Sequence, residues 1–269
     1  NSNTLHPSTL IKNTVLNTAH DLGNAGPDYR FGYGRLNALQ AVRILEENRY
    51  ALNNVTTGTS NDIIINVPAG AARLRVMLTW NDPAGAANAN PALVNNLDLT
   101  VVNGATTTLP WILDPNNPAT PATQGVDNVS NIEQVTINNP AAGSYTLRVN
   151  GTAVPTGPSQ DYALTWSVDQ PYIEVIYPNG GESFNPGTNE TITWDNAGVT
   201  STQTVEYSLN GGSTWTVISS SVPAGTTRLS WSIPAGTNTS TALIRVSSGA
   251  VSDASDANFK ILGTVTGFT

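Results

Sequence analysis

From about residue 55 onward, apolar and polar residues alternate with a period of two, and this pattern constrains the fold more than any other feature. The alternation is clearest in four segments, 73–80, 96–101, 145–149 and 162–168. Successive side chains of a strand point to opposite faces of its sheet, so the pattern is typical of antiparallel strands with one buried face. Turn-rich clusters separate the segments, and a Pro/Asn/Ala-rich excursion runs from Pro110 to Thr123. We therefore predict a β-sandwich over residues 51–169 with one elaborated loop region.

A second β-block follows the polar break at Asp169-Gln170-Pro171. The turn sequence Asn210-Gly211 lies between two apolar runs, which indicates a hairpin because these residues tolerate positive φ angles. About seven short strands in roughly 90 residues are typical of an immunoglobulin-like sandwich. The chain has no cysteine, so this sandwich would lack the usual disulfide. We predict this Ig-like β-sandwich over residues 170–263 and a cut linker over 264–269.

Residues 1–50 follow a different pattern and predict two short helices. The apolar positions expected to face inward are Leu10, Ile11, Val15 and Ala19 in the first helix and Leu36, Leu39, Val42 and Leu45 in the second. Pro7 fits the first turn of the first helix, and Gly23 ends its pattern. Two helices of about three turns each cannot bury a core of their own. We therefore expect them to dock on the first sandwich.

Composition excludes several classes of protein. The chain holds 19 acidic and 11 basic residues among 269, a net charge of −8, so no basic stripe is available for nucleic acid. No apolar run reaches 18 residues, so the chain is not expected to be transmembrane, and its first residues lack a signal-peptide pattern. The absence of cysteine excludes thiol catalysis. Richness in Asn, Thr, Ser and Gly favours a secreted or cell-surface protein.

The helical segment carries a resemblance to a known family. Its motifs Leu16-Asn17-Thr18-Ala19, Gly26-Pro27-Asp28-Tyr29 and Gly32-Tyr33-Gly34-Arg35-Leu36-Asn37-Ala38 occur in order over residues 10–45. They closely resemble the last two helices of the catalytic domain of subtilisin-like serine proteases (subtilases). The resemblance implies that residues 1–50 are the truncated end of such a domain.

The resemblance extends to both predicted sandwiches. Residues 51–168, with Leu78-Thr79-Trp80-Asn81-Asp82 and Val94-Asn95-Asn96-Leu97-Asp98-Leu99, look like the jelly-roll β-barrel fused to certain secreted bacterial alkaline subtilases. That barrel is similar in architecture to the P-domain of proprotein convertases. Residues 172–262, with Tyr177-Pro178-Asn179-Gly180-Gly181-Glu182, resemble Ig-like or fibronectin-type modules of secreted bacterial hydrolases.

The chain lacks the motifs that carry subtilase catalysis. A subtilase needs an Asp, a His and a Ser in that order, with the Ser at the start of a helix that precedes Leu10. Gly58-Thr59-Ser60 comes after that point and leads into a predicted strand, so it indicates a turn. His20 and Asp21 are adjacent on a helix and point about 100° apart. We predict no catalytic or cofactor-binding residue here and no activity of the chain alone.

Calcium is the one ion that the chain is predicted to bind. Hard oxygen ligands suit Ca²⁺, which takes six to eight of them. The related alkaline subtilases bind calcium in the barrel, so the resemblance implies Asp82, Asn96 and Asp98 as first candidates and Asp127 and Asn131 as second ones. The alternative is an ordinary solvated strand face at 96–98 and a plain turn at Asp82-Pro83.

Two functions from different classes fit these observations. In the first, the chain is the non-catalytic C-terminal region of a secreted subtilisin-like serine endopeptidase. Its partner is then the catalytic domain of the same polypeptide, which cleaves protein or peptide substrates. In the second, the chain is an adhesion or carbohydrate-binding β-sandwich module of a surface protein. Trp194, Trp215 and Trp231 alternate with Thr or Ser, so we expect all three in a core rather than on a sugar-binding surface.

Overall fold

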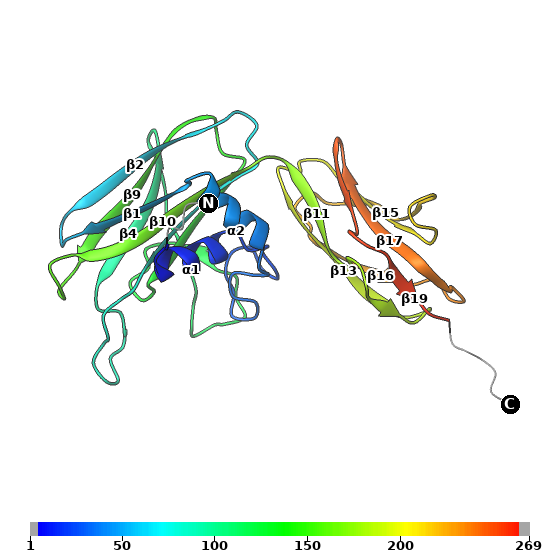
Figure 1. Ribbon diagram of the computed structural model, residues 1–269, viewed down its shortest axis with the longest axis horizontal. Coiled ribbons are helices and arrows are strands. Elements are labelled where there is room, and N and C mark those ends of the chain that lie inside the picture. The colour runs from blue at the N-terminus through cyan, green and yellow to red at the C-terminus, as the bar shows by residue number, and fades with distance from the viewer. Residues whose placement is uncertain (1–4, 264–269) are drawn as a thin grey trace. The chain divides into compact units, whose positions relative to one another are not determined.

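The computed structural model describes residues 5–263 and divides the chain into two compact units, Asn1–Asp169 and Gln170–Thr269 (Figure 1). The predicted linker at 264–269 lies outside the described residues. Each unit is a β-sandwich, and two helices precede the first strand. The predicted fold class, mainly β with an N-terminal helical pair, is confirmed.

The first unit has the strand pairing of a jelly roll. One sheet has the order β1 (Tyr50–Val55), β10 (Gln160–Asp169), β3 (Arg73–Trp80) and β8 (Ile132–Asn138). The other has the order β2 (Ser60–Val67), β9 (Gly143–Ala153), β4 (Asn96–Asn103) and β5 (Thr106–Thr108). The pairs β1 with β10, β2 with β9, β3 with β8 and β4 with β5 are nested inside one another, as in a long hairpin that has been rolled up. The loop excursion holds the short pair β6 (Trp111–Ile112) and β7 (Thr123–Gln124).

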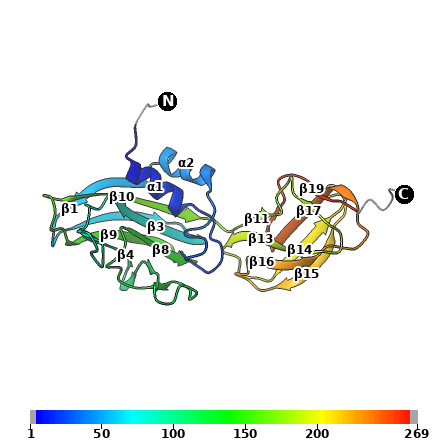
Figure 2. The ribbon, with the colours of Figure 1, turned by 90° about the horizontal axis from the view of Figure 1, so that it is seen from below.

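The core of this unit lies between the two sheets. Leu74, Val76, Leu78 and Trp80 point into it, as their alternation predicts. The intervening residues of β3 are buried as well, so this strand is covered on both faces rather than on one. The second cover is the helical pair, α1 (Ser8–Asn17) and α2 (Ala38–Glu46), of which α1 lies on β10 and β3 (Figure 2).

Hydrogen bonds from buried asparagines hold α1 on the sheet. The Nδ2 group of Asn13 donates to the carbonyl oxygens of Met77 and Ala163, both at 2.9 Å. One turn later, Nδ2 of Asn17 donates to Oγ1 of Thr165 at 2.9 Å, and Asn13 and Asn17 are both 0 % exposed. We call these two side chains the amide seam. An unpaired buried polar group is costly, so the seam favours one position of α1 on the sheet.

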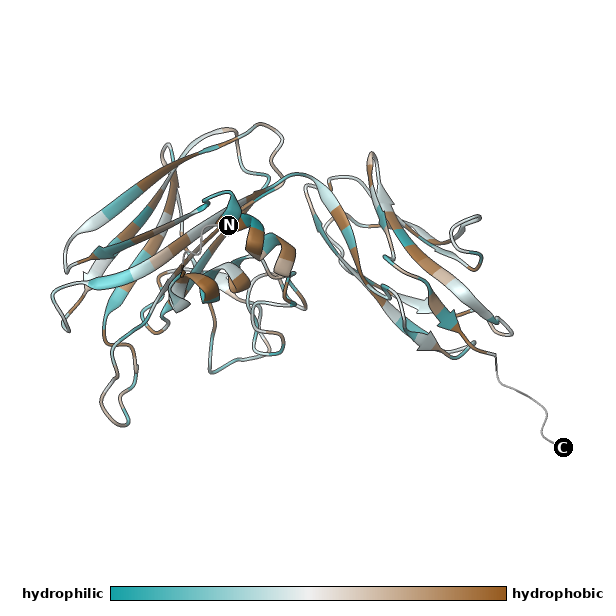
Figure 3. Ribbon diagram, in the orientation of Figure 1, coloured by the Kyte–Doolittle hydropathy of each residue, from teal (hydrophilic) through white to brown (hydrophobic). Residues whose placement is uncertain are grey.

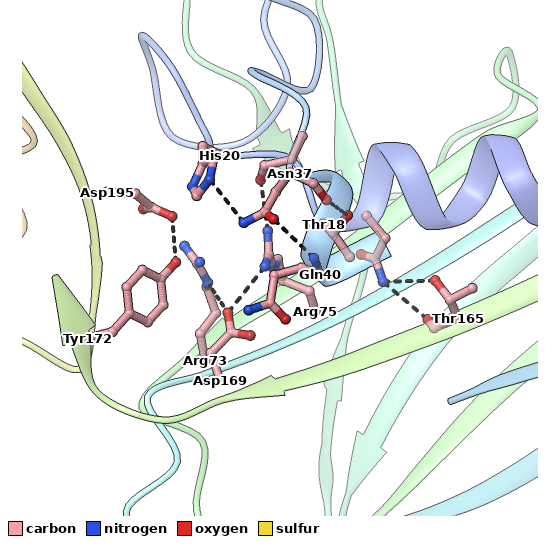
Figure 4. A network of polar contacts seen from close by, with 12 residues as sticks. Thr18, His20, Asn37, Gln40, Arg73, Arg75, Thr165, Asp169, Tyr172 and Asp195 are labelled. Atoms are coloured by element: carbon pink, nitrogen blue, oxygen red, sulfur yellow. Dashed lines mark hydrogen bonds and ion pairs between the residues drawn. The ribbon is translucent and has the colours of Figure 1, made fainter. Parts of the chain in front are cut away.

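Further polar contacts join the helical segment to the sheet and to itself. The Nη1 group of Arg75 donates to the carbonyl oxygen of Ala19 at 2.9 Å. Figure 4 shows Asp169 as the shared partner of Arg73 and Arg75, at 2.9 and 3.3 Å. In the same view the side chains of Asn37 and His20 meet at 3.0 Å. Asn37 also caps α2 by accepting from the backbone N–H of Gln40 at 3.0 Å.

The helical pair docks on the sandwich, but several predicted inward residues face outward. Leu10 and Ala19 are buried as expected. The buried residues of α2 are Ala41 and Ile44. The exposed fractions of the four outward side chains are 43 % for Ile11, 56 % for Leu36, 61 % for Leu39 and 49 % for Val42. The expectation that these four pack inward is therefore wrong. The inner face of α1 is formed by Leu10 together with Asn13, Thr14 and Asn17, and that of α2 by Ala41 and Ile44.

The second unit is a sandwich of a three-stranded and a larger sheet. The first has the order β11 (Tyr172–Tyr177), β13 (Asn189–Ala197) and β16 (Arg228–Ser232). The second has the order β12 (Ser183–Phe184), β19 (Phe259–Ile261), β17 (Thr239–Ser248), β14 (Gln203–Ser208) and β15 (Thr216–Val222), with β18 (Val251–Ala254) beside β17. This arrangement is Ig-like, and β14 and β15 form the predicted hairpin.

Two of the three tryptophans of this unit lie in its core. Trp194 and Trp231 are 1 % and 2 % exposed. Trp215 is instead half-buried near the β14–β15 turn, and the guanidinium of Arg245 lies 4.2 Å from the centre of its ring. The prediction of a core position is wrong for Trp215, because a cation covers its ring in place of the opposite sheet.

The amide seam generates a prediction of stability. Asn13→Ala removes the buried hydrogen bonds of this side chain to two backbone carbonyl oxygens and two threonine hydroxyls. We therefore expect the unfolding free energy of the first unit to fall by about 3 kcal/mol. Urea denaturation of the whole chain measures the change. Asn116→Ala, an exposed position in the loop excursion, is the control and should stay within about 0.5 kcal/mol of the wild type. Equal losses in the two variants would contradict a role of the seam.

Candidate functional site

A buried carboxyl group lies at the centre of the candidate metal site. Glu133 on β8 is opposite Leu78 and has the same parity as Val135, so it points between the two sheets of the first unit. It is 0 % exposed. Its Oε2 atom accepts the backbone N–H of Leu99 on β4 at 2.6 Å, while Oε1 is buried without a partner among the described residues. Glu133 thus links the two sheets through Oε2, while its Oε1 atom is available to bind a ligand.

Burial and nearby carboxylates change the pKa of Glu133. Burial raises the pKa of Glu133 well above its usual range, and the charges of Asp98 and Asp127 raise it further. The hydrogen bond from the Leu99 N–H opposes both effects. Burial also raises the pKa of Tyr33, again with a contribution from Asp127 and Glu133, which places this tyrosine of the helical segment near the same carboxylates.

The side chains around Glu133 come from β4 and from the loop before β8. Asp98 accepts a hydrogen bond from the hydroxyl of Thr152. Oδ1 of Asp127 accepts the backbone N–H groups of Val129 and Ser130, at 2.8 and 3.0 Å. The Nδ2 group of Asn96 donates to Asn128 at 2.9 Å, which leaves Oδ1 of Asn96 as a second buried oxygen without a partner in the described chain. The charges of Asp98 and Asp127 thus lie near Glu133. Asn96 and Asp98 alternate with the core residues Leu97 and Leu99, so their side chains leave β4 on the face that is turned away from the core.

The other two candidates from the sequence form different contacts. Both oxygens of Asp82 accept backbone N–H groups, those of Val94 and Asn95, each at 2.8 Å. The Nδ2 group of Asn131 donates to the carbonyl oxygen of Trp80 at 3.0 Å. Asp82 thus fixes the loop before β4, whereas the charges of Asp98 and Asp127 act on Glu133. The sequence-based selection did not include Glu133.

No ready-made cage of ionisable ligands exists in residues 5–263. There, no three His, Cys, Asp or Glu side chains converge closely enough to hold a metal ion. An ion beside Glu133 would need amide, hydroxyl or backbone oxygens as well as carboxylates, a mixture that Ca²⁺ accepts. The donor set fits a hard cation in its chemistry, because the unpartnered atoms are oxygens.

The second candidate site is the outer apolar face of the helical pair, which we define as Ile11, Leu36, Leu39 and Val42. Leu39 and Val42 are three residues apart in α2, so they lie along one side of the helix, and Leu36 lies two residues before its first residue, Ala38. Figure 3 shows apolar residues on both helices. The exposure of these four aliphatic side chains makes this face a candidate contact surface.

Ser60 and His20 do not form a catalytic pair. Ser60 is the first residue of β2 and lies opposite Asn150. His20 is 4 % exposed, and its backbone pairs with that of Arg35. No hydrogen bond joins Ser60 to a histidine in the described residues, so the geometry gives this serine no base.

Comparisons with known proteins give a weak protease-named relative. No protein-family model matches the chain. A protein of Dictyostelium discoideum described as "Serine protease/ABC transporter B family protein tagA" is 25 % identical over 170 residues, which cover 58 % of this chain and 10 % of that protein. The chain thus spans about a tenth of the length of this relative.

Three solved structures show a low similarity. The adhesin domain of Epf from Streptococcus pyogenes has a TM-score of 0.29 at 7 % identity and covers 82 % of this chain and 78 % of its own. Tripeptidyl peptidase 2 has a TM-score of 0.26 at 15 % identity, with 59 % and 12 % covered. The fibronectin(III)-like modules of CbhA from Clostridium thermocellum have a TM-score of 0.26 at 11 % identity, with 77 % and 98 % covered. These scores are too low to carry an argument. Among the described helices, none is long and apolar enough to cross a membrane.

The raised pKa of Glu133 predicts a dependence of stability on pH in the presence of EDTA. The unfolded chain releases this proton near pH 4.3, whereas the folded chain retains it to higher pH. The folded state therefore binds more protons above pH 4.3, and the stability that Glu133 contributes falls as pH rises toward its folded pKa. We expect Glu133→Gln to reduce this downward slope by up to about 1.4 kcal/mol per pH unit. Urea denaturation between pH 5 and pH 8 tests this, and an identical slope in both proteins would contradict it.

Proposed function

We propose that this chain is the non-catalytic C-terminal region of a secreted subtilisin-like serine endopeptidase. In this proposal it stabilises the catalytic domain of the same polypeptide and assists in substrate or surface attachment. The observation that carries the proposal is the outer apolar face of the helical pair, which lies on the first sandwich yet leaves four aliphatic side chains in water. Proteolysis itself belongs to the whole polypeptide.

The two faces of the helical pair serve different contacts. On the inner face, the amide seam fixes α1 to the sheet through directional hydrogen bonds. On the outer face, covering a side chain such as Leu39 or Val42 contributes about 1.5–3 kcal/mol. A segment that is fixed to one domain on its inner side and exposes aliphatic side chains on its outer side suits a position between two domains.

The catalytic domain is the occupant that the residues favour for the outer apolar face. The helices carry the Gly32-Tyr33-Gly34-Arg35-Leu36-Asn37-Ala38 motif that resembles the end of a subtilase catalytic domain. In such a domain the last helices pack on the rest of the same fold. The name of the Dictyostelium discoideum relative, which includes a serine protease, supports the same class.

We also propose that the region around Glu133 binds Ca²⁺. Oε1 of Glu133 is a buried oxygen without a partner among the described residues, and the carboxylates of Asp98 and Asp127 add negative charge near it. Oδ1 of Asn96 on β4 is a second unpartnered oxygen in the same part of the chain. Asp82 and Asn131 take no part in this version of the site, because their polar groups bind backbone atoms. A bound ion would stabilise the first unit, because the unfolded chain does not assemble these oxygens.

The interdomain role predicts an effect of the outer apolar face on the protease. In the polypeptide extended upstream of Asn1, we expect a subtilase nucleophile motif and peptidase activity that the 269-residue chain lacks. The double variant Leu39→Ser, Val42→Ser should shorten the half-life of that activity at raised temperature severalfold, because it weakens the domain contact. Ile64→Ser is the matched control, since Ile64 is an aliphatic residue on β2 with 72 % exposure. An upstream sequence without the motif, or equal half-lives for the two variants, would contradict the proposal.

The calcium proposal predicts different melting curves with EDTA and with Ca²⁺. At a hundredfold excess over Kd the ion should stabilise the first unit by about 2.7 kcal/mol. Glu133→Gln and Asp98→Asn should each remove most of this increase, whereas Asp114→Asn, an exposed carboxylate in the loop excursion, should retain it. Calorimetry of the three variants measures the shift. Superimposable wild-type curves with and without Ca²⁺ would exclude the site.

A further inference from the structure

A polar groove lies on the outer face of the first unit, apart from the metal candidate and the outer apolar face. It has a volume of about 580 Å³ and opens where α1 begins. Pro7 and Thr9 of the helix start form one wall, and Leu52, Asn54, Asn81 and Asp161 are among the sheet residues that line it. Its size falls in the range of small-ligand sites.

The strand register places three polar side chains of the groove in one row. Asn54 of β1 is opposite Asp161 of β10. Trp80 of β3 is opposite Tyr162, so Asn81, the next residue along, is level with Asp161 on its other side. Tyr162 and Trp80 point into the core, and their neighbours therefore point outward. With strands about 4.8 Å apart, the row Asn54, Asp161, Asn81 is about 10 Å long.

Within residues 5–263, the three side chains of this row are without hydrogen-bond partners. None of them makes a side-chain hydrogen bond to any of the described residues, and all three are exposed. Farther along the same face, α1 covers the polar side chains of β3 and β10. The hydroxyl of Thr79 donates to the carbonyl oxygen of Thr9, and that of Thr165 donates to Oδ1 of Asn13. The uncovered row is thus the part of this face that is free to bind a ligand.

The chemistry of the groove selects the ligand class. Its lining includes one carboxylate, several carboxamides and no cationic side chain, so an anionic ligand would be repelled. An apolar ligand would leave the three polar side chains desolvated and unpaired. A carboxylate can accept hydrogen bonds from two hydroxyl groups, and each carboxamide can both donate and accept hydrogen bonds. We propose that this groove binds a neutral saccharide, with Asp161 as the central acceptor and Leu52 in contact with the C–H face of a sugar ring.

Binding of the 269-residue chain to four neutral oligosaccharides tests the proposal. The probes are the hexamers of cellulose, amylose, xylan and chitin, measured by calorimetry and by amide chemical shifts. We expect at least one to bind with shifts centred on residues 52–54, 81 and 159–162. Asp161→Ala should weaken this binding at least tenfold, and Asn54→Ala or Asn81→Ala severalfold. Asp114→Ala is the control for loss of an exposed carboxylate and should bind like the wild type.

The outcomes that overturn the proposal are distinct. Absence of binding by all four hexamers at millimolar concentration would do so, and so would equal affinity of the wild type and Asp161→Ala. A glycine-serine hexapeptide is the last probe, because an extended peptide could pair with the free edge of β1 instead. If the peptide binds and displaces the sugar from these residues, the groove is a peptide site. Unchanged melting curves of the variants show that each loss is local.

Discussion

The arrangement of the first unit depends on two buried amide groups. Aliphatic contacts alone would let a short helix slide or turn on a sheet at little cost, because they have no direction. Asn13 and Asn17 instead bind particular carbonyl and hydroxyl oxygens of β3 and β10, so only one position of α1 satisfies all of them. The contact between His20 and Asn37 fixes the start of α2 relative to the segment that follows α1. The position of α1 on the sheet therefore determines which side of the helical pair remains in water.

The fold was largely predictable, but the contact face of the helices was not. Period-two alternation identifies the strands of both sandwiches because it records the pleat directly. It does not reveal that Arg75 and Thr79 of β3 are also buried, since their partners Ala19 and Thr9 belong to the helical segment. For the helices, the aliphatic stripe predicted an inward face over Leu36, Leu39 and Val42. An apolar stripe shows that a helix has an apolar face but does not show which neighbour covers that face. In α2 the inner residues are Ala41 and Ile44. In α1 they include Asn13 and Asn17, which the sequence pattern alone assigns to the surface.

The candidate metal site was partly predictable for a related reason. Asp98 and Asp127 were among the predicted ligands, and their charges act on Glu133. Glu133 itself, the most buried carboxyl group of the site, was not among the five ligands predicted from the sequence. A signal existed, because Glu133 has the parity of Val135 and Ile137 and therefore occupies a core position of its strand. Asp82 was chosen from the sequence as a metal ligand, but both of its oxygens accept backbone N–H groups of residues 94 and 95. The sequence alone does not show that those groups lie beside Asp82. The groove row depends on the register of three strands that are far apart in the sequence.

One pairing in the second unit bears on how that unit responds to tension. β12 runs parallel to β19, with Ser183 opposite Lys260 and Phe184 opposite Ile261. Backbone hydrogen bonds from Lys260 to Glu182 and from Leu262 to Phe184 join the two strands. If the ends of this unit are drawn apart, parallel neighbours are pulled lengthwise in opposite directions, so these bonds share the load and must break together. An antiparallel pair pulled from one end would open one bond after another. The short β12–β19 contact is therefore the part of the Ig-like unit whose backbone bonds lie across the direction of such a pull.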